Sequence, residues 1–155
     1  MDLILWRHAD AADAAFGESD FERALTNKGR TQAKRMAAWL NERLPADSIV
    51  LVSPARRAQQ TAAALKREVI TRDALGTGAD CKTLLAAVLG PRAESTIVVV
   101  GHQPTLGQVA SLLLTGVEAA LSVRKGAVWW LRCADTGARG RADAVLLAAM
   151  TPGLL

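Results

Sequence analysis

The sequence predicts a three-layer α/β/α sandwich with a mostly parallel central sheet and an antiparallel edge strand. Short apolar runs alternate along the chain with segments of helical periodicity, which is typical of strands and helices around a parallel sheet. The last two apolar runs are separated only by a glycine-rich turn, as in a β-hairpin. With 155 residues, half of them hydrophobic, the chain suits one domain over residues 1–155 with a single core.

The predicted strands are apolar runs bounded by polar or turn-forming residues. They are residues 2–6, 48–52, 69–71, 96–100, 127–133 and 142–150. The last two flank the turn at 136–140 and form the predicted hairpin.

The predicted helices lie between the first strands, at residues 26–44, 54–67, 79–89 and 104–114. Thr26 is a predicted N-cap, because a threonine hydroxyl accepts a hydrogen bond from a backbone N–H of the first turn. Ser53 and Pro54 fit the N-cap and first position of the second helix. Gly90 and Pro91 close the third helix, and Pro104 opens the fourth.

Composition excludes several classes of function. The formal charge of +4, from 19 basic and 15 acidic residues, is a mild excess that favours anionic partners. With 4% aromatic residues, the chain offers no stacking platform for nucleic acid. No apolar run reaches the roughly 18 to 20 residues of a membrane span, and the start lacks the features of a signal peptide. We therefore expect a cytoplasmic protein that binds neither nucleic acid nor membrane.

The two cysteines, Cys81 and Cys133, are far apart in the sequence and form no Cys/His cluster. We expect reduced cysteines in or near the core, with neither a disulfide nor a metal.

Three polar segments directly follow predicted strands, at residues 7–10, 53–57 and 101–104. In open α/β sheets, ligands bind beyond the carboxyl ends of the strands. A single polar residue at a strand end is more often a capping residue than a catalyst. Here both histidines of the chain, His8 and His102, occupy such positions together with several arginines.

This set of side chains suits phosphoryl chemistry. Guanidinium groups hold a phosphoryl group bidentately, and helix N-termini add N–H donors. A neutral imidazole is a competent nucleophile toward phosphorus, and a second histidine can donate to the phosphoryl oxygens. No metal or cofactor is required, and two histidines without a carboxylate partner at ligand spacing fit zinc poorly.

These residues resemble the histidine phosphatase superfamily, which includes phosphoglycerate mutases and acid phosphatases. The family's RHG motif reads Arg7-His8-Ala9 here. The likeness is closest to the short SixA-type branch of phosphohistidine phosphatases. It rests on the LTNKG segment at 25–29, the SPxxRAxQT block at 53–61 and the GHQP segment at 101–104. The resemblance runs from end to end and implies a phosphoglycerate mutase-like fold.

The resemblance assigns roles to individual residues. His8 corresponds to the phosphorylated nucleophile, and Arg7, Arg57 and His102 to the catalytic and substrate-binding phosphate pocket, with Ser53 as a further substrate-binding residue. Arg57 matches the family arginine, because it directly precedes the alanine of the RAxQT block. The neighbouring Arg56 is expected at the solvent or the substrate rim.

The sequence departs from the larger family members in two ways. Ala9 replaces the usual glycine and adds a methyl group that can shift the loop. The insertion that carries a general acid in larger members is absent. Asp10, the nearest motif carboxylate, either takes part in proton transfer and positioning or helps to order its loop. A missing acid suits a histidine leaving group, since a protonatable nitrogen leaves more easily than an alkoxide.

The predicted function is that of a metal-independent, monomeric phosphatase with a phosphohistidine intermediate at His8. The resemblance implies a phosphorylated protein partner, such as a histidine phosphotransfer domain or a phosphotransferase-system protein. The alternatives are a phosphatase of small phosphomonoesters and a non-catalytic phosphate-binding module. The arginines are expected to lower the pKa of His8. His102 is more useful to the reaction when it is protonated, so we expect the two histidines to titrate as a coupled pair.

Overall fold

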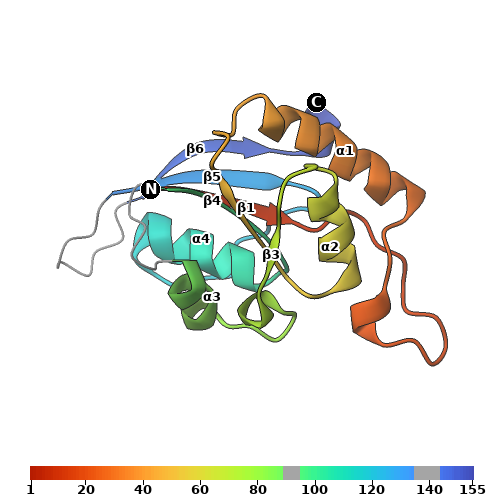
Figure 1. Cartoon of the computed structure of the whole chain (residues 1–155). Helices are drawn as coiled ribbons and strands as arrows, with labels where there is room; N and C mark the ends of the chain where they lie inside the picture. Colours follow the sequence, from red (N-terminus) through yellow and green to blue (C-terminus); the bar gives the residue numbers. More distant parts are fainter. Residues whose placement is uncertain (89–94, 135–143) are drawn as a thin grey trace.

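The computed structural model describes residues 1–88, 95–134 and 144–155. A six-stranded sheet has the strand order β3-β2-β4-β1-β5-β6 (Figure 1). The first four strands are mutually parallel, β5 runs antiparallel to β1, and β6 runs antiparallel to β5. The predicted mostly parallel sheet with an antiparallel edge strand is therefore confirmed. The strands are β1 Asp2–Arg7, β2 Ile49–Val52, β3 Ile70–Thr71, β4 Thr96–Gly101, β5 Val128–Cys133 and β6 Ala144–Met150.

Helices cover both faces of the sheet, with α1 and α2 on one face and α3 and α4 on the other (Figure 1). Successive side chains of β1 point alternately to the two faces of the sheet and pack against the helices on both. Leu3 and Leu5 pack with α3 and α4, whereas Ile4 and Trp6 pack with α1 and α2. Each such fully buried side chain contributes about 1.5 to 3 kcal/mol. The helices are α1 Asn27–Asn41, α2 Arg56–Ala63, α3 Cys81–Val88 and α4 Thr105–Thr115, with three-residue 3-10 helices η1 Asp20–Glu22, η2 Asp73–Leu75 and η3 Pro152–Leu154.

The predicted helix starts are right at α1 and wrong at α2. The Thr26 hydroxyl accepts a hydrogen bond from the Gly29 N–H at 2.9 Å, as an N-cap does. By contrast, α2 starts at Arg56 with Ala55 as its N-cap, and Ser53 is not the cap. The Ser53 hydroxyl is already used, because it accepts from the Ala55 N–H and contacts His102.

The predicted turn at 136–140 and the predicted Gly90-Pro91 helix stop lie outside the described residues. Cys81 and Cys133 are free and buried. In the described ranges, no helix combines the length and apolarity that a membrane span needs.

The ends of β1, β2 and β4 meet at one edge of the sheet, because β4 lies between the other two strands. The His8 N–H donates to the Gly101 carbonyl at 3.1 Å, and the Ser53 N–H donates to the Val100 carbonyl at 3.0 Å. The antiparallel strand β5 begins at this same edge, where the Gly126 N–H donates to the His8 carbonyl at 3.1 Å. The three predicted polar segments are thus brought together.

Candidate active site

The two nitrogens of the His8 ring have different hydrogen-bond partners, and these partners fix which nitrogen carries the hydrogen. Its Nδ1 lies 2.8 Å from the Ala9 carbonyl oxygen, which can only accept, so Nδ1 carries the hydrogen. The lone pair of a neutral ring is then on Nε2, which accepts from Arg57 Nε at 3.3 Å. The tautomer that a nucleophile at Nε2 needs is therefore fixed by the backbone.

The environment keeps His8 neutral. The pKa of His8 is lowered to about 4, chiefly by burial and also by the positive charges of Arg57, Arg7 and Lys125, against the opposing effect of the hydrogen bond to Ala9. The direction agrees with the sequence-based prediction, although burial and not the arginines is the main cause. At neutral pH the ring keeps the lone pair that an attack on phosphorus requires.

His102 lies beside His8, with 5.2 Å between the ring centroids. The pKa of His102 is lowered to about 3, chiefly by burial and also by His8 and Arg57. The protonated His102 that would be more useful to the reaction is therefore not the state of the protein by itself, because burial and the nearby positive charge disfavour the imidazolium. The negative charge of a phosphoryl group beside the ring would raise this pKa again.

Ser53 is fully buried and holds His102 in place. Its hydroxyl lies 2.7 Å from His102 Nε2 and accepts from the Ala55 N–H at 3.2 Å. The geometry gives Ser53 a role in positioning His102, and the substrate contact of Ser53 stays a prediction. When the hydroxyl donates to Nε2, His102 Nδ1 carries a hydrogen, and this nitrogen is buried with no partner in the described part of the chain. The Nδ1–H group of His102 is therefore available to donate a hydrogen bond to an oxygen of a ligand.

Arg57 is 4% exposed, whereas Arg56 is exposed, which agrees with the choice between these neighbours. Besides its bond to His8, the Arg57 guanidinium donates to Asp20 twice. Nη1 donates to the Asp20 carbonyl at 2.6 Å, and Nη2 donates to the carboxylate Oδ2 at 3.0 Å. Asp20 belongs to η1 in the loop between β1 and α1, which projects beside α2 (Figure 1). A carboxylate thus already binds the arginine predicted to bind phosphate.

Arg7 supplies a second guanidinium at the end of β1. Its Nη1 donates to the Val123 carbonyl at 2.8 Å, which anchors the side chain. Its Nε is buried without a partner among the described residues. Because an unsatisfied buried N–H is costly, such a donor at a strand-end site is suited to an incoming oxyanion.

Asp10 is tied into the loop that follows His8. One carboxylate oxygen pairs with Lys125 Nζ at 2.9 Å, and the other accepts from the Thr26 hydroxyl at 2.8 Å. The hydrogen bond from Lys125, followed by that from Thr26, lowers the pKa of Asp10. An ionised, paired carboxylate holds no proton to donate at neutral pH, so this geometry favours the loop-ordering role over proton transfer.

Ala9 fits its position without strain. The residue is fully buried and packs with Ala11, Leu25 and Ala33. Its N–H donates to the Thr61 hydroxyl at 3.1 Å, which ties the His8 loop to α2. Its φ is not in the left-handed region. The methyl group that replaces the family's glycine hydrogen is therefore part of the core packing.

Sequence reasoning missed two residues, Asp20 and Lys125. Lys125 could have been predicted from the topology. It precedes the antiparallel strand β5, and an antiparallel strand starts at the edge of the sheet where the parallel strands end. Asp20 lies in an irregular loop with neither periodicity nor a motif around it, so nothing local marks it. Among the residues that the structure describes, no three His, Cys, Asp or Glu side chains are grouped so that they could hold a metal ion.

Comparison with known proteins places this chain in a family. Residues 3–76 match the model of the histidine phosphatase superfamily (branch 1), a stretch that contains His8 and Arg57. The solved structure of a candidate phosphohistidine phosphatase SixA from Nakamurella multipartitia is 32% identical, with a TM-score of 0.77, over 97% of this chain and 95% of that one. The chain belongs to the histidine phosphatase superfamily.

Within this superfamily the chain belongs to the SixA-type branch. The structure of the protein histidine phosphatase SixA complexed with tungstate is 26% identical, covers 99% of both chains and has a TM-score of 0.83. The phosphohistidine phosphatase SixA of Escherichia coli K12 is 45% identical over 62 residues, which are 39% of this chain and 37% of that protein. The phosphoglycerate mutase-like sandwich of this histidine phosphatase superfamily member is thereby confirmed.

Proposed function

We propose that this member of the superfamily removes the phosphoryl group from phosphohistidine in a protein, through a phosphohistidine intermediate at its own His8. The observation that carries the proposal is the His8 ring, whose Nδ1–H is fixed on the Ala9 carbonyl while Nε2 faces the Arg57 guanidinium. The Nε2 lone pair thus lies beside a phosphate-binding group, and it becomes free to attack phosphorus when the Arg57 N–H turns from Nε2 to a phosphoryl oxygen.

The proposed reaction has two displacements. His8 Nε2 forms a bond to phosphorus as the P–N bond to the substrate imidazole breaks, and solvent protonates the departing nitrogen. Water then attacks the phosphorus of phosphorylated His8, which releases inorganic phosphate and restores the neutral ring. Arg57, Arg7 and His102 stabilise the negative charge of the phosphoryl oxygens in both steps, in place of a metal ion.

The state of the nearby carboxylates supports phosphohistidine over a phosphate ester. Asp10 and Asp20 are both ion-paired, and hydrogen bonds from their cationic neighbours lower the pKa of each. Neither holds a proton to give to an alkoxide at neutral pH. An imidazole leaving group takes its proton from water more easily, so it depends less on an enzyme acid.

A phosphoryl trap tests this proposal. The protein is mixed with a phosphohistidine protein labelled with ³²P, in buffer with EDTA, and is then denatured and mapped. Because the chain has only two histidines, label at His8 and label at His102 are the two outcomes for a phosphohistidine. We expect label at His8, none in the His8→Asn variant, and slower labelling, still at His8, in the matched His102→Asn variant. Label at His102, or turnover by folded His8→Asn, would contradict the mechanism.

The substrate class is tested separately, by comparing kcat/KM for the phosphohistidine protein with that for a sugar phosphate. We expect the phosphohistidine protein to be preferred by at least about a hundredfold. A preference for the sugar phosphate would favour the alternative, a small phosphomonoester phosphatase. Tight phosphate binding without turnover of any substrate would favour a phosphate-binding module.

A further inference from the structure

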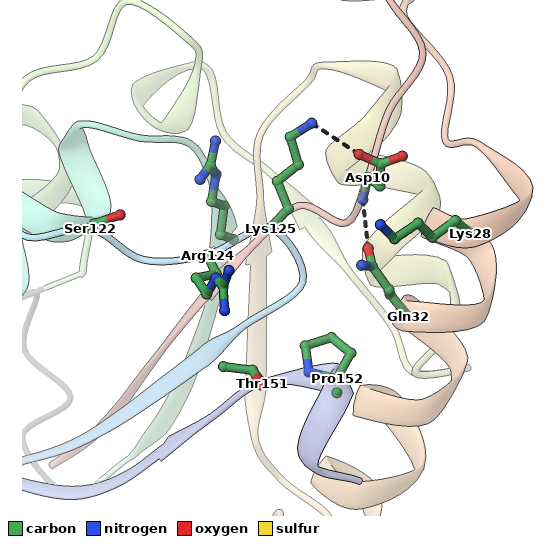
Figure 2. Close-up of a pocket in the computed structure, with 10 residues that line it drawn as sticks. Asp10, Lys28, Gln32, Ser122, Arg124, Lys125, Thr151 and Pro152 are labelled. Atoms are coloured by element: carbon green, nitrogen blue, oxygen red, sulfur yellow. Dashed lines mark hydrogen bonds and ion pairs between the residues drawn. The ribbon is translucent and has the colours of Figure 1, made fainter.

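An open pocket adjoins the predicted phosphoryl site. It has a volume of about 480 Å³ and is lined by residues from the start of α1, the segment before β5 and residues 151–153. Figure 2 shows Lys125 reaching toward Asp10, with Lys28 on the α1 side and Arg124 across the pocket. Arg7 also lines it, so the two sites share a wall.

This pocket is strongly basic. Its lining includes four cations, namely Arg7, Lys28, Arg124 and Lys125, against a single carboxylate. That carboxylate, Asp10, is paired with Lys125. Lys28 and Arg124 have no ion-pair partner in the part of the chain that the structure describes. The pocket therefore has an excess of positive charge that the described residues do not neutralise.

The pocket is electrostatically connected to the nucleophile. The charge of Lys125 contributes to the lowered pKa of His8, and Arg7 is the direct neighbour of His8 in the chain. Because Arg7 belongs both to the predicted phosphate site and to the pocket lining, groups that adjoin a phosphoryl group at His8 would lie near this pocket. A second anionic group on that substrate would meet Lys28 and Arg124 there.

We propose that this basic pocket binds the carboxylate of an acidic side chain that lies close to the phosphohistidine of the protein substrate. The inference rests on the proposed function and adds a specificity determinant to it. Small-molecule pockets are lined mainly by apolar groups that enclose the ligand, whereas here Pro152 is the one apolar side chain of the lining. Lys28, Arg124 and Lys125 are exposed, as suits a carboxylate delivered by a docked protein surface.

The test uses two phosphohistidine peptides of equal length. In one, glutamates flank the phosphohistidine on both sides, and in the other glutamines replace them. We expect the wild-type protein to prefer the glutamate peptide about tenfold in kcat/KM at low ionic strength, equivalent to about 1.4 kcal/mol. The preference should decrease with added salt, because exposed charges are screened.

The variant Lys28→Ala/Arg124→Ala should lose this preference. Its matched control, Lys34→Ala/Arg35→Ala, removes two exposed charges of α1 that do not line the pocket, and it should keep the preference. Equal turnover of the two peptides by the wild type, or an unchanged preference in Lys28→Ala/Arg124→Ala, would overturn the inference while the proposed function stands. Failure to hydrolyse either peptide, with active hydrolysis of aryl phosphate, would instead overturn the proposed function.

A further arm separates protein from small-molecule ligands. It compares phosphoserine with phosphoethanolamine, which lacks the carboxylate. If Lys28→Ala/Arg124→Ala removes a preference for phosphoserine and leaves the peptide preference intact, the second anion belongs to a small substrate and the proposal is wrong.

Discussion

At the level of single residues, the guanidinium of Arg57 donates hydrogen bonds both to Asp20 and to His8. Its Nη2 donates to the Asp20 carboxylate at 3.0 Å, while its Nε donates to the nucleophile at 3.3 Å. The Asp20 side chain is about half exposed, at 53%, and hydrogen bonds from Arg23 and then Arg57 lower its pKa. The ionised Asp20 carboxylate would therefore compete with a bound phosphoryl group for the Arg57 guanidinium.

We expect Asp20→Asn to tighten the binding of inorganic phosphate. The amide oxygen keeps an acceptor for Arg57, but the negative charge that repels and competes with phosphate is gone. For a half-exposed charge the gain is about 0.7 to 1 kcal/mol, or about three- to fivefold in the competitive inhibition constant of phosphate. Asp13→Asn is the matched control, because Asp13 is fully exposed and 3.8 Å from Arg23, away from Arg57. Unchanged or weaker inhibition would show that Asp20 orients Arg57 and does not compete for it.

At the scale of elements, the first turn of α1 packs directly on the loop that carries the site. The Thr26 N–H donates to the Asp10 carbonyl at 3.0 Å, and Gln32 accepts from the Asp10 N–H at 2.9 Å. A Cβ on Gly29 would overlap the Asp10 carbonyl. The glycine is thus required by the close approach of helix and loop, and the register between α1 and the site depends on it.

Gly29→Ala is a sensitive test of this packing, because two effects have opposite signs. Alanine in a helix is favoured over glycine by about 1 kcal/mol, so an uncrowded site would be stabilised. Overlap with backbone instead costs about 1 to 3 kcal/mol, so we expect net destabilisation and a lower kcat. Urea denaturation and turnover measure both. Gly78→Ala, where a Cβ meets nothing within 4 Å, should change stability by less than about 0.5 kcal/mol. A stabilised, fully active Gly29→Ala protein would refute the close contact.

The elements also show why some features could be predicted from the sequence and others could not. The strands were predictable because β1, β2 and β4 are buried on both faces and read as apolar runs. Thr26 capping was predictable because it depends on a local hydrogen bond. The start of α2 was not, because the Ser53 N–H still pairs with the Val100 carbonyl of β4 and its hydroxyl contacts His102, 49 residues away. Such a competition between local and tertiary partners leaves no trace in the local sequence.

At the scale of the whole molecule, the convergence of His8, Arg57 and His102 follows from chain topology. Parallel strands with β4 in the middle bring their carboxyl ends together, so motif positions alone predicted the cluster. The charge state of His102 could not be predicted in the same way. It depends on burial at 4% exposure and on the positive groups that the assembled fold places around it. Whole-molecule burial therefore sets the electrostatics of the site.

This burial predicts how the stability of the whole molecule depends on pH. The folded-state pKa values of about 4 for His8 and about 3 for His102 lie below the value of about 6.5 expected in the unfolded chain. Between the folded-state pKa values and about pH 6.5, both histidines bind protons in the unfolded state but not in the folded state. The free energy of unfolding should therefore fall as the pH decreases from about 6.5 toward 4, and should recover as the pH rises.

The expected loss is about 2 kcal/mol between pH 6.5 and pH 5.5, because both histidines contribute about equally there. Urea denaturation in phosphate-free buffers measures it, since phosphate would stabilise the folded state by binding. The chain has only two histidines, and carboxylates titrate mostly below this window, so the slope is a histidine signal. Each single variant, His8→Asn or His102→Asn, should halve it, and the double variant should remove it. A wild-type stability that stays constant from pH 6.5 to 5.5 would mean that both rings accept protons in the folded protein, and the neutral, buried histidine pair would have to be abandoned.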